Sequence, residues 1–348
     1  MPIHFEFGSG AASGWREWVD NELSYAGFMG LLQQAGVLKA IISSSRLSNF
    51  RDLYNLRHLV RWWCTTTHTL FFSYGELTVT IEDVANQLLL PILGDVDPAT
   101  LEFSLEEEAI EAKLKKRMTE NAKLSYWVSS SSKFSIIAHR VAFVAFWLCK
   151  FIFGFHPHYA MKLLYFHLTI KISARVSLPL APMFLGHLCV QLDILRSDES
   201  HIVTSSVHCT ILQQLLFEHC AQYLTKCRPA CFARDKYQSC PRLITDFCGR
   251  FESDFPLAFC WSSLKPIGYS VVKSFDEGVG FSLRAYRSLG TNFTCIDSAM
   301  GLFVDTVGTT TPLVGFDETR ITYLAATNTK WLPYLADEGI RFIHYLAN

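Results

Sequence analysis

The chain has 348 residues, which is enough for one large domain or two smaller ones. Half of these residues are hydrophobic and 27 are phenylalanine, so the chain can bury a sizeable core and is not expected to be disordered. The formal net charge of −1 argues against a protein whose main task is to hold nucleic acid through bulk positive charge, although a local basic patch stays open.

The first predicted elements are helices. The pattern of apolar residues predicts them near residues 15–19, 22–34 and 52–63, and the serine run at residues 43–45 predicts a loop between the last two. No secretory signal is expected ahead of them, because the first six residues have neither a basic start nor a long apolar run.

Residues 62–91 predict a hairpin followed by a helix. Two β-prone runs, 69–73 and 77–80, flank a turn at residues 74–76, where Gly75 can supply the positive φ of a tight turn. The hairpin should therefore bring two short antiparallel strands together just before the next helix.

The sequence contains signals for both the first and the last turn of that helix. Thr80 is placed as the N-cap with Asp83 three residues later, close to a capping box, and Pro91 stops the helix. An apolar stripe should face the core, made of Ile81, Val84, Ala85, Leu88 and Leu89.

The character of the chain changes between residues 95 and 133. Charged residues dominate a predicted helix with little apolar face, which indicates a solvated excursion or linker. Residues 134–153 then predict a helix that is apolar nearly all round and therefore central and buried. Further helices are expected at residues 159–175, 183–195 and 207–225.

After residue 229 the helical periodicity decays. Short β-like runs at residues 269–275, 281–286 and 302–307 alternate with glycine and proline turns. The predicted fold is therefore mainly α, a multi-helix globular domain with a small β-hairpin and a mixed α/β C-terminal part. We expect a single unit over residues 1–348, divided into segments 15–94, 95–133, 134–226 and 227–348.

Membrane association is not expected. The most span-like stretch, residues 176–192, contains Pro179 and Pro182 and indicates two core segments joined by a kink. The eleven cysteines are odd in number and accompany no export signal, which predicts reduced thiols in a soluble cytosolic or nuclear protein.

Three ionisable residues of the hairpin and its helix could converge into a metal or acid–base site, namely His68, Glu76 and Asp83. The favoured interpretation is local and structural: His68 closes a strand, Glu76 lies in the turn and Asp83 caps the helix. No nucleophile, dinucleotide or Walker-type motif is complete, and no Schiff-base lysine or phosphate loop for pyridoxal phosphate is apparent. We expect no cofactor and no catalytic residue.

A zinc site is the second metal hypothesis, with Cys227, Cys231, Cys240 and Cys248 as ligands. Cys227 and Cys231 have a tolerable ligand spacing, but no second close pair accompanies them. Buried free thiols that pack as small apolar groups are the favoured interpretation.

Nucleic-acid contact is a third hypothesis. Arg57 and Arg61 are one helical turn apart and could both face a phosphate backbone. Because the same predicted helix has an apolar side, an ordinary amphipathic surface helix is favoured over a DNA-binding one.

Residues 62–91 also resemble the signature of the plant mobile domain family. The resemblance rests on Thr67-His68-Thr69, the aromatic pair Phe71-Phe72, Gly75-Glu76-x-Thr78-x-Thr80, and an Asp83-Val84 helix ending in Leu90-Pro91. Upstream, Trp15-x-x-Trp18 fits the family as well, and the resemblance extends to about residue 218.

The chain departs from the family in two places. The family usually has Leu-Gly-Leu-Pro where this chain has Leu88-Leu89-Leu90-Pro91, so the end of that helix should pack differently. The Arg-Gln-Phe-Gly-like segment that often closes longer members has no match, which predicts a truncated or transposon-derived copy.

The resemblance implies a non-catalytic nuclear interaction module of the MAINTENANCE OF MERISTEMS-like group, which includes retrotransposon-associated copies. It implies roles in transposon silencing, meristem maintenance and genome stability, and a serine/threonine phosphatase-like protein as partner. The label "aminotransferase-like" that such proteins carry finds no support in the residues. Open alternatives are a nucleic-acid-binding module or transposon-derived protein, a metal-dependent enzyme, and a cytoplasmic location.

Overall fold

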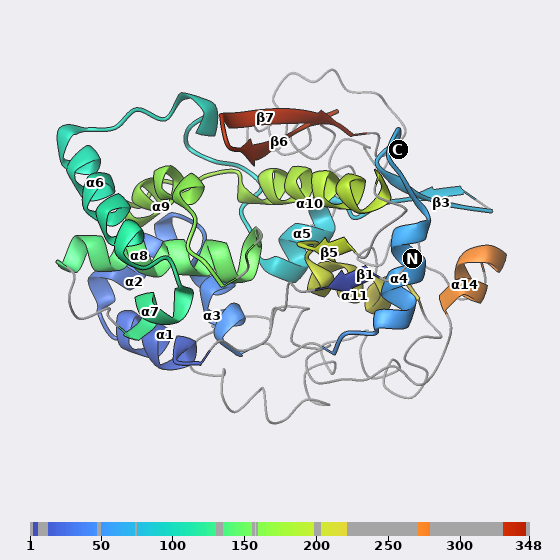
Figure 1. Cartoon of the computed structure of the whole chain (residues 1–348), viewed down its shortest axis with the longest axis horizontal. Helices are drawn as coiled ribbons and strands as arrows, with labels where there is room; N and C mark the ends of the chain where they lie inside the picture. Colours follow the sequence, from blue (N-terminus) through green and yellow to red (C-terminus); the bar gives the residue numbers. More distant parts are fainter. Residues whose placement is uncertain are drawn as a thin grey trace, which may run out of the picture.

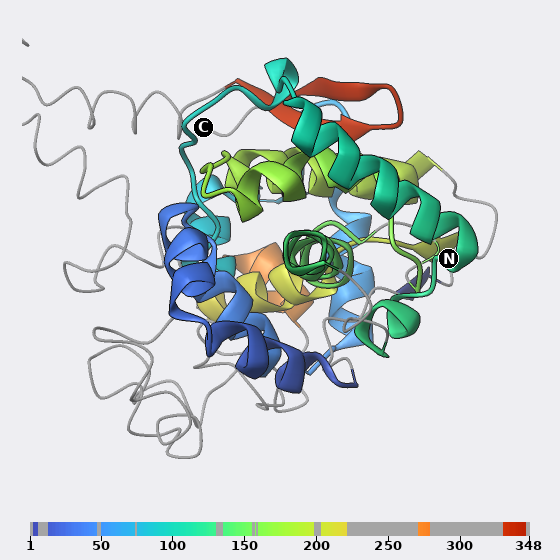
Figure 2. The same cartoon turned by 90° about the vertical axis from the view of Figure 1, so that its left-hand side faces the viewer.

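The computed structural model describes residues 3–5, 13–46, 50–73, 75–129, 135–154, 157, 159–197, 203–220, 271–278 and 330–345. Within these residues the protein is mainly helical, with a small three-stranded antiparallel sheet and a C-terminal hairpin, which confirms the predicted fold class. The elements gather around one central helix, which Figure 2 shows end-on.

The N-terminal part consists of four short helices, α1 (Trp15–Leu23), α2 (Ala26–Gln34), α3 (Leu38–Arg46) and α4 (Leu53–Arg61). The loop predicted at residues 43–45 is wrong, because these buried serines lie inside α3. The hydroxyl of Ser44 donates to the carbonyl of Ile41 at 2.7 Å, and Ser45 donates to Ile42 at 2.8 Å. Bonded in this way to the preceding turn, serine side chains can be buried in a helix.

The hairpin region forms a three-stranded sheet in the order β2 (Trp63–Cys64), β3 (Thr69–Phe72), β4 (Gly75–Leu77). Phe72 pairs with Gly75, so the second strand begins at Gly75. The predicted strand at residues 77–80 and the placement of Glu76 in the turn are therefore wrong. The positive φ expected at Gly75 is confirmed at 152°.

Helix α5 (Ile81–Leu88) follows the sheet and begins as predicted. Thr80 is its N-cap, and the reciprocal bonds of a capping box join Thr80 and Asp83. The helix ends one residue before Leu89, which adopts a left-handed conformation with φ 58° and ψ 34°. Pro91 follows and prevents the helix from continuing.

Helix α8 (Ile136–Trp147) is the central element, and a π-helical turn (Leu148–Ile152) extends it. Every side chain from Val141 to Trp147 is buried, which confirms the prediction from the apolar sequence, whereas Ile136 and Ile137 at the start of the helix are exposed. Around it lie the other predicted helices, α9 (Phe166–Ser173), α10 (Leu180–Ser197) and α11 (Cys209–His219), with short 3₁₀ turns at Leu163–Tyr165 and Pro98–Thr100.

The charged helix is α6 (Leu105–Glu120), and α7 (Leu124–Ser129) follows it. Although largely exposed, α6 packs against α8 and α9 through the buried Leu114. A salt bridge of 2.8 Å joins Lys171 to Glu107. The charged segment is thus attached to the helical body, and the proposed division of the chain at residues 95–133 stays a prediction.

The remaining strands join distant parts of the chain. β1 (Ile3–Phe5) pairs in parallel with β5 (Val203–Ser205), and β6 (Trp331–Ala336) pairs with β7 (Gly339–His344) in a hairpin that lies along α10 (Figure 1). The strand predicted at residues 269–275 is wrong, because α14 (Val271–Glu277) is a helix. The runs predicted at residues 281–286 and 302–307 lie outside the described residues.

Among the described residues, no single helix is both long and apolar enough to cross a membrane. The bent pair formed by α2 and α3, with 109° between the two helices, meets the length and composition test only when the two are taken together.

Candidate functional site

His68 lies in the turn between β2 and β3 and contacts a residue of α10, which is distant in the sequence. Its Nε2 is 3.0 Å from Oδ2 of Asp193, and the indole of Trp63 donates to the other oxygen of Asp193 at 2.8 Å. The backbone of His68 has a left-handed φ of 55°, a conformation that histidine adopts more readily than most residues. The carboxylate of Asp193 in α10 therefore binds both Trp63 of β2 and His68 of the turn that follows.

The charge state of His68 follows from this pair. The hydrogen bond to Asp193 raises the pKa of His68; burial acts in the opposite direction, and the charge of Asp193 adds to the increase. The carbonyl of His344 also favours the protonated ring, although Nδ1 makes no hydrogen bond of acceptable geometry among the described residues. His68 and Asp193 thus form a hydrogen-bonded pair that favours the protonated ring and joins the sheet to α10.

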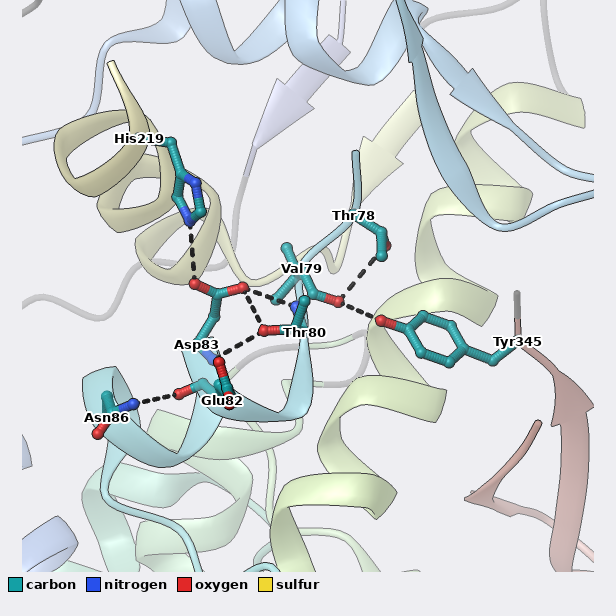
Figure 3. A network of polar contacts seen from close by, with 8 residues as sticks. All are labelled: Thr78, Val79, Thr80, Glu82, Asp83, Asn86, His219 and Tyr345. Atoms are coloured by element: carbon teal, nitrogen blue, oxygen red, sulfur yellow. Dashed lines mark hydrogen bonds and ion pairs between the residues drawn. The ribbon is translucent and has the colours of Figure 1, made fainter. Parts of the chain in front are cut away.

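Asp83 is the best-connected residue of the signature (Figure 3). Its Oδ2 accepts hydrogen bonds from the backbone and hydroxyl of Thr80 at 2.7 and 2.8 Å. Its Oδ1 lies 3.2 Å from Nε2 of His219, the last residue of α11. The carboxylate therefore caps α5 with one oxygen and binds α11 with the other.

The surroundings of Asp83 stabilise its ionised form. Complete burial would raise the pKa of Asp83, but the hydrogen bond and the charge of His219, together with Thr80, outweigh that effect and lower it. Asp83 is only 2% exposed and His219 only 3%, so a molecule in solvent does not reach this pair.

The C-terminal hairpin contacts the same segment from the other side. Tyr345, directly after β7, donates from its hydroxyl to the carbonyl of Val79 at 2.9 Å (Figure 3). Thr78 donates to the carbonyl of His68 at 3.1 Å. The backbone between the sheet and α5 is thereby held by two hydroxyl groups.

Glu76 contacts neither His68 nor Asp83. It is exposed on β4, where its Oε2 accepts a hydrogen bond from Thr69 at 2.8 Å across the sheet. The three residues proposed for a metal or acid–base site, His68, Glu76 and Asp83, therefore point to three different partners. In the part of the chain that the structure describes, no group of three His, Cys, Asp or Glu residues is placed to hold a metal ion.

The four cysteines of the zinc hypothesis, Cys227, Cys231, Cys240 and Cys248, lie outside the described residues, and that hypothesis stays open. Of the described cysteines, only Cys64 is partly exposed. Burial raises the pKa of the thiol of Cys149 to about 12 and raises that of the Cys189 thiol as well, so both pack as neutral apolar groups.

The two tryptophans upstream of the signature are buried in the core. Trp15 stacks on Phe143 with ring centroids 4.9 Å apart. Trp18 donates from its indole to Nε2 of His139 at 3.0 Å, while Nδ1 of His139 lies 3.2 Å from Glu22. Burial and the neighbouring Arg140 lower the pKa of His139, which matches a neutral ring that accepts the indole hydrogen bond.

The two arginines of the nucleic-acid hypothesis face different surroundings. Nε and Nη2 of Arg57 donate to the carbonyl of Ile3 in β1 at 3.4 and 3.3 Å, whereas Arg61 is exposed. Both arginines lie in α4 at the predicted spacing of one helical turn, but only the side chain of Arg61 projects freely toward solvent.

Sequence reasoning missed the partners of the signature residues: Asp193, His219 and Tyr345. They are separated from His68, Asp83 and Val79 by 125, 136 and 266 residues, so no local pattern joins them. The sequence contains one signal, because Asp193 is the only charged residue in the largely apolar stretch 180–195, and a buried or half-buried charge needs a partner.

The resemblance seen in the sequence is confirmed by comparison. The model of the family described as "Plant mobile domain" matches residues 36–323. No curated protein and no solved structure matches the chain.

Proposed function

Since the chain belongs to the plant mobile domain family, we propose that it is a non-catalytic module that acts in the nucleus by binding a protein partner. The proposed roles are transposon silencing, meristem maintenance and genome stability, in the manner of the MAINTENANCE OF MERISTEMS-like group. The proposed partner is a serine/threonine phosphatase-like protein. These roles rest on the family, because a fold alone does not establish a function.

A non-catalytic role is supported by the contacts of the ionisable groups in the signature, which pair with other residues of the chain. Asp83 pairs with His219 of α11 and His68 pairs with Asp193 of α10, and both Asp83 and His68 are more than nine-tenths buried. A general acid or base must come within hydrogen-bonding reach of its substrate. Groups held in this way serve the fold, which leaves the exterior of the domain to carry the function.

The test uses the full chain as bait in plant nuclear extract, with mass spectrometry of the bound proteins. A matched bait carrying Phe143→Asp, which places a charge in the core beside Trp15, controls for binding to unfolded protein. The proposal predicts a phosphatase-like protein that only the folded bait retains and that forms a stable complex when both proteins are purified. Equal recovery by both baits, or no complex between the purified proteins, would contradict it.

Metal analysis of the purified chain addresses the enzyme alternative. The proposal predicts no stoichiometric metal and an unchanged melting temperature after treatment with a chelator. One equivalent of zinc lost together with stability would instead support the site formed by the four cysteines of residues 227–248.

A further inference from the structure

The outward face of α4 carries ring-bearing and basic side chains in alternation. The helix lies beside α14 (Figure 1), and its other face is buried in the core. Residues three and four positions apart share one face of a helix. The outward face, continued by the C-cap residue, therefore consists of Tyr54, Arg57, His58, Arg61 and Trp62.

The three rings of this face contact one another. The ring centroids of Tyr54 and His58 are 4.6 Å apart, and those of His58 and Trp62 are 6.3 Å apart. Trp62 also packs against Phe72 and Phe275, with centroid distances of 5.1 and 5.2 Å. Tyr54, at the other end of the row, is 59% exposed. The row of rings therefore begins against the core and ends in solvent, and its own contacts hold it in place.

The two arginines of this face have no acidic partner among the described residues. Nε and Nη2 of Arg57 donate to the carbonyl of Ile3 at 3.4 and 3.3 Å, which orients the guanidinium without neutralising its charge. Arg61 is exposed. Burial lowers the pKa of His58, and the charge of Arg61 lowers it further. Because α4 itself contains no acidic residue, the charge that its outward face carries is positive.

Acidic residues mark the two ends of this face. At one end, Asp52 caps α4 with its side chain. At the other end, Asp276 and Glu277 follow Phe275, the residue of α14 that packs on Trp62. Between these ends the helix advances about two turns, roughly 11 Å, which is the length of about three stacked nucleotides.

We propose that the outward face of α4 binds single-stranded nucleic acid, with a base stacked on Tyr54 and with Arg57 and Arg61 in contact with phosphates of the strand. Surfaces that bind single strands combine positive charge along the backbone with aromatic side chains on which the bases stack. The phosphates supply the anionic partner that the two arginines lack within the described chain. A base can stack on a side chain only when it is not enclosed in a duplex, so a double strand offers the phosphates without the second contact.

An acidic polypeptide fits this face less well. Its carboxylates could pair with the two arginines, but acidic side chains offer no flat ring to Tyr54. Every nucleotide of a single strand carries both a phosphate and a base, which matches the alternation of arginine and ring along the helix. This inference does not depend on the nuclear role or on the phosphatase-like partner proposed above.

The test measures binding of the full chain to a short fluorescent oligouridylate by fluorescence anisotropy at several salt concentrations. An oligothymidylate, a DNA duplex of the same length and polyglutamate are compared with it. Both single strands should bind, and the duplex and polyglutamate should bind about fivefold or more weakly, because they lack the stacked base. Tighter binding of oligouridylate than of oligothymidylate would support a further contact to the ribose hydroxyl, and equal binding would support contact through base and phosphate alone.

Substitutions separate the two kinds of contact. Tyr54→Ala should weaken binding of the single strands about fivefold or more, because one stacked base is lost. Arg61→Gln should reduce the steepness of log affinity against log salt concentration by about 0.7, the value for one phosphate contact on a single strand. Tyr159→Ala and Arg175→Gln, at exposed positions on other elements, are the matched controls and should change neither quantity.

Three results would overturn the proposal. The first is that neither single strand binds at low salt. The second is unchanged affinity in both Tyr54→Ala and Arg61→Gln, whose exposed positions should leave the melting temperature close to that of the unmodified chain. The third is a duplex or polyglutamate that binds as tightly as the single strands and is released by the same two substitutions, which would assign the face to double-stranded DNA or to an acidic polypeptide.

Discussion

At the scale of single residues, Leu89 shows how this chain departs from its family. The residue occupies the position where the family usually has glycine, and it keeps the left-handed conformation that glycine would adopt, with φ 58° and ψ 34°. For a leucine that conformation costs roughly 1–2 kcal/mol. Its side chain packs partly against the core, which offsets some of the cost.

Two substitutions separate these effects. Leu89→Gly and Leu89→Ala both remove the packing, but only glycine removes the backbone strain. Leu89→Gly should therefore have a free energy of unfolding about 1 kcal/mol higher than that of Leu89→Ala, as measured by urea denaturation. Inside a right-handed helix the order is reversed, so an alanine variant more stable than the glycine variant would refute the conformation described for this residue.

The pairing of His68 with Asp193 should make the stability of the fold depend on pH. The pKa of His68 in the folded protein is raised above its usual value of 6.5, so the folded state binds this proton more tightly than the unfolded state does. The resulting stabilisation is fully present below pH 6.5 and is lost as the pH rises through the folded pKa.

The difference in unfolding free energy between the unmodified chain and His68→Gln should therefore be larger below pH 6.5 than in mildly alkaline buffer. Asp193→Asn should remove most of this dependence while leaving an oxygen to accept the hydrogen bond from Trp63. A difference that stays constant over this range of pH would show that the pair carries no proton-linked stability.

At the scale of elements, the C-terminal hairpin depends on one glycine of α10. A Cβ built at Gly186 would overlap the carbonyl oxygen of Pro333 in β6 and would lie 3.3 Å from Cβ of Leu332. The strand can approach the helix this closely only because position 186 has no side chain. Tyr345, which binds the signature segment, follows the second strand of the same hairpin.

Gly186→Ala should accordingly destabilise the protein by about 1–3 kcal/mol, because the backbone of β6 must move away from α10. The matched control is Gly30→Ala in α2, where the added Cβ meets no atom within 4 Å. There the same change should stabilise by about 0.5–1 kcal/mol, since alanine favours a helix. Denaturation curves in which both substitutions stabilise would exclude the close contact of β6 with α10.

An element is predicted well from the sequence when nearby residues determine it, and poorly when other contacts do. The largely apolar sequence of residues 134–153 is enough to predict α8, and the Thr80–Asp83 spacing is enough to predict the start of α5. The serines of α3 mislead because their hydroxyls bond to the preceding helical turn, a possibility that composition does not reveal. Strand β2 is too short to leave a periodic pattern, and α14 has β-branched residues at its start.

At the scale of the whole molecule, the signature segment is where distant parts of the chain meet. Helix α10 binds it at His68, α11 binds it at Asp83, and the C-terminal hairpin binds it at Val79. The sequence supports the prediction that these residues are structural, because a local role can be assigned to each. It does not reveal their partners, because these contacts span more than a hundred residues and arise only when the chain folds.

The central claim is that the ionisable residues of the signature hold the fold together, and a double-mutant cycle tests it directly. Asp83→Asn, His219→Gln and the double variant are compared with the unmodified chain by urea denaturation at neutral pH. A buried pair that loses one partner is destabilised by roughly 3–5 kcal/mol, and contacting residues couple by about 0.5–3 kcal/mol. The exposed pair of Glu338 and Arg341 in the C-terminal hairpin serves as the control, with an expected coupling of about 0.2–1 kcal/mol.

Both single variants at the buried pair should lose much stability, and the coupling energy of that pair should be well above that of the control. Single variants as stable as the unmodified chain, with a coupling no larger than that of the control, would contradict it. Asp83 and His219 would then be free of a structural role, and a chemical one would have to be sought for them.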